Sequence, residues 1–99
     1  MKLEVQLELL ESAADQLGVR VSYETLQATP GMRGGLCKVK PKGGTGMEWR
    51  VIVDKRATAE ERVATLATAL ARFDTSELEL PAPIRETLRL YAGKRPAAA

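Results

Sequence analysis

One helical stretch of the sequence brings together side chains that could form a binding surface. Four positions within VATLATALARF (63–73) lie three or four residues apart, on one side of a predicted helix: Thr65, Thr68, Ala69 and Arg72. A guanidinium pairs with a carboxylate through two hydrogen bonds, and arginine is enriched at binding hot spots. We therefore expect this face to bind a partner with Arg72 as its anchor. The alternative is an ordinary solvent-facing helix surface.

The sequence lacks the residue types on which most catalytic sites depend. It contains no histidine and a single cysteine, Cys37. The missing histidine removes Ser-His-Asp and Cys-His nucleophile systems and every histidine-ligated zinc or iron site, and one thiol cannot build a four-cysteine site. Neither a calcium-binding loop nor a phosphate-binding glycine loop occurs. We expect no catalytic residue, no metal, no cofactor and no enzymatic activity; an enzyme based on carboxylates or lysine is the alternative that this composition leaves open.

A second candidate surface lies in the basic middle of the chain. Residues 31–56 carry seven basic side chains against two acidic ones. Basic strands approach phosphates, and an aromatic ring can stack on a base. The candidate nucleic-acid-binding residues are Arg33, Lys38, Lys40, Lys42, Trp49 and Arg50. The alternative is a sheet edge that lysines protect from aggregation, with Trp49 in the core.

The rest of the sequence supplies the elements that position these residues. Hydrophobic periodicity predicts a helix over 2–17 and strands over 19–24, 35–40 and 48–54. A second predicted helix begins after Thr58. Thr58 caps that helix and Glu61, three residues later, completes a capping box. Cys37 alternates with Val39, which places its side chain in the core.

A third helix completes the predicted order of elements. Pro83 suits its first turn, and Ile84, Leu88 and Tyr91 share one face. We expect an α+β fold in the order α-β-β-β-α-α, with a small three-stranded antiparallel sheet packed on helices. Residues 1–93 form a single domain and 94–99 a flexible tail.

The first helix carries more apolar surface than one packing partner requires. Its main stripe runs through Leu3, Leu7, Leu10, Ala14 and Leu17, and its acids fall together on another side. Val5 and Leu9 lie away from both. A second apolar face predicts self-association, most simply as a homodimer that buries Val5 and Leu9.

The order of elements resembles the ImmA/IrrE-type family of zinc metallopeptidases. In that family a strand similar to VIVD (51–54) precedes a helix that reads roughly T-L-A-His-Glu-L-G-His. Thr65, Leu66 and Ala67 match the start of that motif. The two histidines fall on Thr68 and Arg72, and the catalytic glutamate falls on Ala69, so neither the metal nor the general base can be present. The resemblance implies a shortened, degenerate domain of this shape, a pseudoenzyme without metal.

Taken together, the residues predict a non-catalytic protein-interaction or regulatory module. A nucleic-acid-binding protein that uses the hairpin over 33–56 is the alternative. The sequence has no apolar run long enough for a membrane span and no signal peptide, and a single cysteine suits a reducing compartment. We expect a cytoplasmic protein whose partner is another protein, with no membrane contact.

Overall fold

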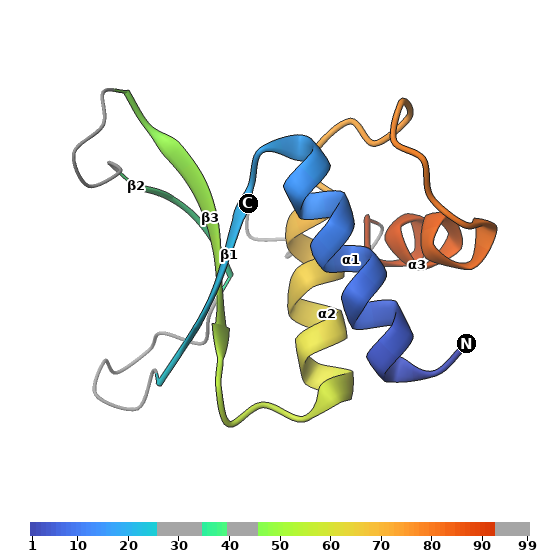
Figure 1. Ribbon diagram of the computed structural model, residues 1–99, viewed down its shortest axis with the longest axis horizontal. Coiled ribbons are helices and arrows are strands. Elements are labelled where there is room, and N and C mark those ends of the chain that lie inside the picture. The colour runs from blue at the N-terminus through green and yellow to red at the C-terminus, as the bar shows by residue number, and fades with distance from the viewer. Residues whose placement is uncertain (26–34, 40–45, 93–99) are drawn as a thin grey trace.

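Among the residues that the computed structural model describes (1–25, 35–39 and 46–92), three helices lie on one side of a three-stranded sheet (Figure 1). The α+β class is thereby confirmed. The elements follow one another as α1 (Leu3–Leu17), β1 (Arg20–Glu24), β2 (Gly35–Val39), β3 (Glu48–Asp54), α2 (Ala59–Leu70) and α3 (Ala82–Ala92). The predicted tail over 94–99 lies outside the described residues.

The sheet is mixed, so the prediction of a purely antiparallel sheet is wrong. Its strand order is β1-β3-β2, which differs from the order along the chain. β2 pairs with β3 in antiparallel fashion, whereas β1 pairs with β3 in parallel. Val51 of the central strand lies opposite Val21 on one side and Leu36 on the other. This register lines up apolar side chains on the sheet face that the helices cover.

Capping residues mark the end of α1 and the beginning of α2. Gly18 follows α1 with φ of 75°, a left-handed conformation that suits glycine, and its N–H donates to the carbonyl of Asp15 at 3.1 Å. The Thr58 hydroxyl accepts from the Glu61 N–H at 3.1 Å, and the Glu61 carboxylate accepts from the Thr58 N–H at 2.9 Å. The predicted capping box of α2 is confirmed.

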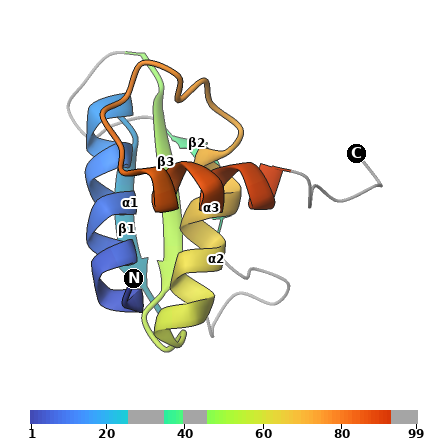
Figure 2. The same ribbon diagram turned by 90° about the vertical axis from the view of Figure 1, so that its right-hand side faces the viewer.

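The core lies between the sheet and α1 and α2, and α3 crosses these two helices on the side away from the sheet (Figure 2). The predicted apolar face of α3 is confirmed, since Ile84 and Leu88 are buried and Tyr91 packs against the core. The largest fully buried side chains are Leu10, Leu66, Leu70, Ile84, Val51 and Val53. In the described part of the chain, no helix is both long and apolar enough to cross a bilayer.

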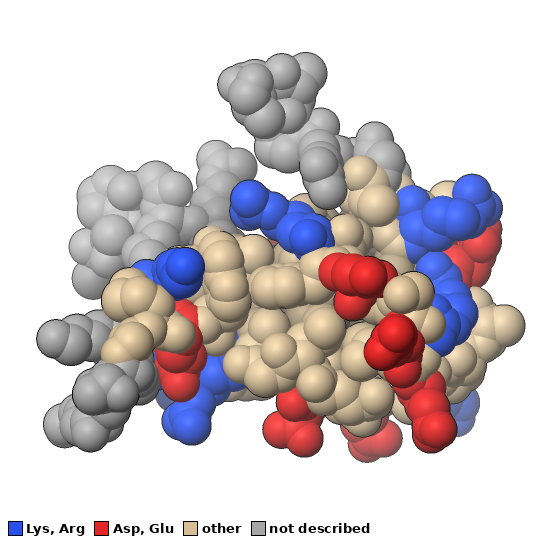
Figure 3. All heavy atoms as spheres, turned by 90° about the horizontal axis from the view of Figure 1, so that it is seen from above, with Lys and Arg blue, Asp and Glu red and all other residues tan. Residues whose placement is uncertain are grey.

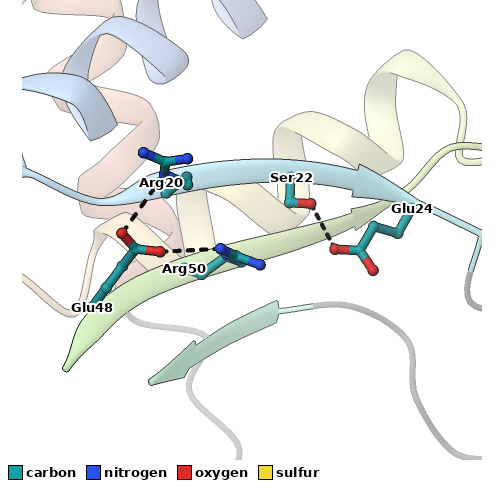
Figure 4. A network of polar contacts seen from close by, with 5 residues as sticks. All are labelled: Arg20, Ser22, Glu24, Glu48 and Arg50. Atoms are coloured by element: carbon teal, nitrogen blue, oxygen red, sulfur yellow. Dashed lines mark hydrogen bonds and ion pairs between the residues drawn. The ribbon is translucent and has the colours of Figure 1, made fainter. Parts of the chain in front are cut away.

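The other face of the sheet carries polar side chains. Glu48 forms ion pairs with Arg20 at 3.7 Å and Arg50 at 3.1 Å, and the Ser22 hydroxyl donates to Glu24 at 2.6 Å (Figure 4). Cys37 lies opposite Arg50 and does not belong to the core cluster, so its predicted core position is wrong. Leu36 packs against the core, and neighbouring residues of a strand point to opposite faces.

Candidate partner-binding groove

A groove between α2 and β2 contains all four residues of the predicted partner-binding face. Its volume is about 320 Å³. The described residues that line it are Gly35, Leu36, Ala64, Thr65, Thr68, Ala69 and Arg72. Gly35 and Leu36 of β2 and Ala64 of α2 do not belong to the predicted face. Among these described lining residues, Arg72 carries the only charge.

Burial divides the four predicted residues into a floor and a rim. Ala69 is 3% exposed and belongs to the core cluster, so it forms part of the floor. Thr65 and Thr68 are half-buried, and the Thr65 hydroxyl donates to the Glu61 carbonyl within the helix at 3.0 Å. Arg72 is exposed and follows α2, so its guanidinium is open to solvent. This face can therefore contact a ligand through two threonines and one arginine.

The other wall of the groove is the strand β2. Among the described strands, β2 lies at an edge of the sheet, because it is bonded to β3 alone. An edge strand presents a row of backbone N–H and C=O groups that another chain can pair with. Leu36 points toward α2 and lines the groove. Hydrophobic alternation could have identified Leu36 as core-facing, but nothing in the sequence shows that β2 lies beside α2.

An aromatic and a cation lie beyond the Arg72 end of this groove. The Lys38 Nζ is 5.2 Å from the centre of the Trp49 ring, and that ring contacts Phe73 edge to face with centroids 5.7 Å apart. Phe73 directly follows Arg72 in the chain. Trp49 is 37% exposed and does not belong to the core cluster, so the alternative that places it in the core is wrong. Lys38 and Trp49 therefore lie near the Arg72 end of the groove, outside its described lining.

The three candidate nucleic-acid-binding residues that the structure describes do not share one face of the sheet. Arg33, Lys40 and Lys42 lie outside the described residues. Lys38 and Trp49 are cross-strand neighbours on the helix-facing side of the sheet, whereas Arg50 points to the other side and is paired with Glu48. In the view from above, the described basic side chains lie in separate groups (Figure 3). Nucleic-acid binding stays a prediction.

A larger hollow, of about 600 Å³, lies where α1 and β1 meet. Two of its three carboxylates already have partners in the chain. Glu48 is paired with arginines, and Glu11 accepts a hydrogen bond from the Tyr23 hydroxyl. Burial raises the pKa of Tyr23 to about 12, and the hydrogen bond to Glu11 acts in the same direction. The hydrogen bond and ion pairs around this hollow therefore stabilise the junction of α1 with the sheet.

The candidate self-association residues differ in their surroundings. Val5 is 40% exposed, as the wide apolar face of the first helix predicts. Leu9 is half-buried and packs against the core, so the expectation that it lies away from the packing stripe is wrong. An α-helix that packs against both α2 and the sheet uses a wider stripe than the sequence pattern suggested. Self-association through Val5 stays a prediction.

The described residues contain no group of three or more carboxylate, thiol or imidazole side chains that could hold a metal ion. In the groove, Thr68 and Arg72 occupy the positions at which the resembled peptidase motif has its histidines, and Ala69 is buried at the position of its glutamate. The resemblance to ImmA/IrrE-type peptidases stays a prediction. Comparison with family models, with curated proteins and with solved structures gave no match.

Proposed function

We propose that this chain is a non-catalytic protein-interaction module and that the groove between α2 and β2 receives an extended segment of another protein. One observation carries the proposal. The helix face that the sequence marks as a binding surface lines a groove whose opposite wall is β2, which is an edge strand among the strands that the structure describes. A peptide can pair its backbone with such an edge while its side chains enter the adjoining groove.

The chemistry of the groove favours binding over catalysis. Its described lining consists of two threonines, one arginine, and small or apolar residues. A threonine hydroxyl needs a neighbouring base to act as a nucleophile, and this lining supplies none. The resemblance to ImmA/IrrE-type peptidases implies that the groove corresponds to a former substrate cleft without its metal ligands. A regulatory role through a bound partner follows from the same proposal.

A substitution that fills the groove tests this function. Thr68→Phe places a ring in the groove, and Thr87→Phe is a matched control on α3, since both threonines are half-buried on helices. Affinity purification of the wild type from its native cells, followed by mass spectrometry, identifies candidate partners. We expect a direct partner to bind the purified wild type and Thr87→Phe alike and to lose at least about tenfold in affinity for Thr68→Phe, as expected for a central contact.

Folding of the variants is measured separately, by urea denaturation. Thr68→Gln, which narrows the groove with a smaller side chain, is measured beside Thr68→Phe, and a groove-filling variant that unfolds at a much lower urea concentration than the wild type is left out. If every partner that binds the wild type directly binds both groove-filling variants equally well, the groove is not the binding site and the proposal is wrong.

A further inference from the structure

The groove changes character along β2, from an apolar hollow to a pair of cations. Leu36 and Lys38 are two residues apart on one strand, so their side chains point to the same face. Leu36 lies opposite Val51 and lines the hollow, whereas Lys38 lies opposite Trp49. Because Trp49 contacts Phe73, the Lys38 end of β2 lies near the end of α2, where Arg72 is found. Two adjacent positions along the groove therefore offer different chemistry.

Both cations at this end lack an acidic partner among the residues that the structure describes. The three ion pairs in that part of the chain use Arg20, Arg50 and Arg89. Lys38 and Arg72 are exposed, and no carboxylate lines the groove beside them. The ring of Trp49 contributes an apolar surface under the Lys38 ammonium. A carboxylate placed here would meet two positive charges without displacing an existing ion pair.

An extended peptide laid along β2 would present its side chains to these two positions in turn. Alternate residues of a strand point to the same face and lie roughly 7 Å apart, which matches the separation of Leu36 and Lys38 on β2. The residue facing Leu36 would enter the hollow of about 320 Å³, which suits an aliphatic side chain. The next residue on that face would lie between Lys38 and Arg72.

We propose that the segment bound in the groove carries an aliphatic side chain and, two residues away, an aspartate or glutamate whose carboxylate pairs with Arg72 and Lys38. This inference rests on the proposed function and specifies the class of its partner. The carboxylate belongs to a side chain and not to a chain end, because β2 continues past Lys38 to Val39. A peptide paired with this edge therefore has backbone partners beyond the two cations.

Selection of peptides tests the inference without a known partner. A display library of random decapeptides, presented once with a free C-terminus and once fused through the C-terminus, is selected on the immobilised wild-type protein. We expect enrichment of peptides in which an aliphatic residue and an acidic residue are separated by one position. Fluorescence anisotropy then measures the affinity of an enriched peptide and of the same peptide with its acidic residue replaced by the amide.

Charge-neutralising variants locate the carboxylate. Arg72→Gln and Lys38→Gln should each weaken an enriched peptide by about tenfold, as expected for truncation of a charged hot spot. They should leave the amide peptide within about twofold of its affinity for the wild type. Lys55→Gln is the matched control, because Lys55 is exposed in the turn before α2 and should change neither peptide.

The outcomes separate this inference from the proposed function. In one outcome, enriched peptides bind Thr68→Phe more weakly than the wild type but bind Arg72→Gln and Lys38→Gln as tightly as the wild type. That result would overturn the acidic motif and leave the groove as the binding site. Peptides that bind only through a free C-terminal carboxylate would overturn it as well. If no peptide is enriched, or if enriched peptides bind Thr68→Phe as tightly as the wild type, both the motif and the groove are wrong.

Discussion

The contact between Tyr23 and Glu11 makes a specific prediction about stability. The Tyr23 hydroxyl donates to the Glu11 carboxylate and so joins β1 to α1. The Arg62 guanidinium lies 5.3 Å from the centre of the same ring. Tyr23→Phe removes the hydroxyl and keeps the ring, so packing against the core and the contact with Arg62 are preserved. The measured loss then reports the hydrogen bond.

The expected loss follows from the charge and the exposure of the pair. A hydrogen bond to a charged group contributes roughly 1.5–3 kcal/mol when it is well buried. Tyr23 and Glu11 are only half-buried, so water can replace the hydroxyl at the carboxylate. We therefore expect Tyr23→Phe to lower the free energy of unfolding by about 1 kcal/mol at neutral pH.

The raised pKa of Tyr23 adds a pH dependence of definite sign. Burial and the hydrogen bond to Glu11 favour the neutral phenol, so its pKa rises from 10.0 to about 12 in the folded chain. The stabilisation is fully present below the unfolded-state pKa of 10.0, and it is lost as the pH rises through about 12. Since the side chain is partly open to water, we expect a loss of about 1 kcal/mol across this range.

Urea denaturation of four proteins tests the contact: the wild type, Tyr23→Phe, Glu11→Gln and the double variant. We expect a coupling energy of about 1 kcal/mol between the two positions at neutral pH. Ultraviolet titration of the phenol, in a Tyr91→Phe background, measures its pKa directly. A coupling energy below about 0.3 kcal/mol, or a phenol that titrates at its ordinary value, would refute the reasoning.

Three further measurements address the cap and the two other predicted surfaces. Thr58→Ala should lower the free energy of unfolding by about 1 kcal/mol, because the Glu61 N–H loses its acceptor; Thr87→Ala on α3 is the control, and equal losses would contradict a specific role for the cap. In sedimentation, we expect the wild type to form a dimer at high concentration and Val5→Glu to be monomeric, and a wild type that stays monomeric ends that hypothesis. For the nucleic-acid alternative, oligonucleotide affinity should fall steeply with salt, and Lys38→Glu should weaken all sequences alike. No gel shift at low salt would remove that alternative.

The helices could be predicted because their signals are local. The apolar positions of α1 recur at helical spacing, Gly18 ends that helix, and Thr58 with Glu61 begins α2. Each of these signals acts within a few residues, so the rest of the chain does not change it. The apolar face of α3 follows from the same kind of local pattern.

The sheet could be predicted only in part, because strand pairing is a contact between distant residues. Alternation predicts a strand over 19–24 but does not identify the neighbouring strand or its direction. The consecutive apolar run Val51, Ile52 and Val53 was the available signal, since a strand buried on both faces is typical of a central position. Alternation groups Cys37 with Val39 and Leu36 with Lys38, but it does not say which group faces the core. In the structure Leu36 packs against the core, so Cys37 points to the other face.

The candidate groove shows the same division between local and distant information. Helical spacing groups Thr65, Thr68 and Arg72 on one side of the predicted helix, and the structure places all three on the groove although α2 ends at Leu70. The wall formed by Leu36 depends on the position of β2 in the sheet, which spacing does not specify. The ring contact between Trp49 and Phe73 likewise joins segments far apart in the sequence.

The parallel pairing of β1 with β3 has a consequence for the synthesis of this chain. β1 cannot be completed as part of a sheet until the residues of β3, from Glu48 to Asp54, have been made. The apolar face of α1 stays uncovered for longer, because it packs against α2, which is made after β3. Since chains are made from the N-terminus onward, the first third of this protein leaves the ribosome without its partners. On the ribosome, we expect the N-terminal segment to stay open to chaperones until α2 has emerged.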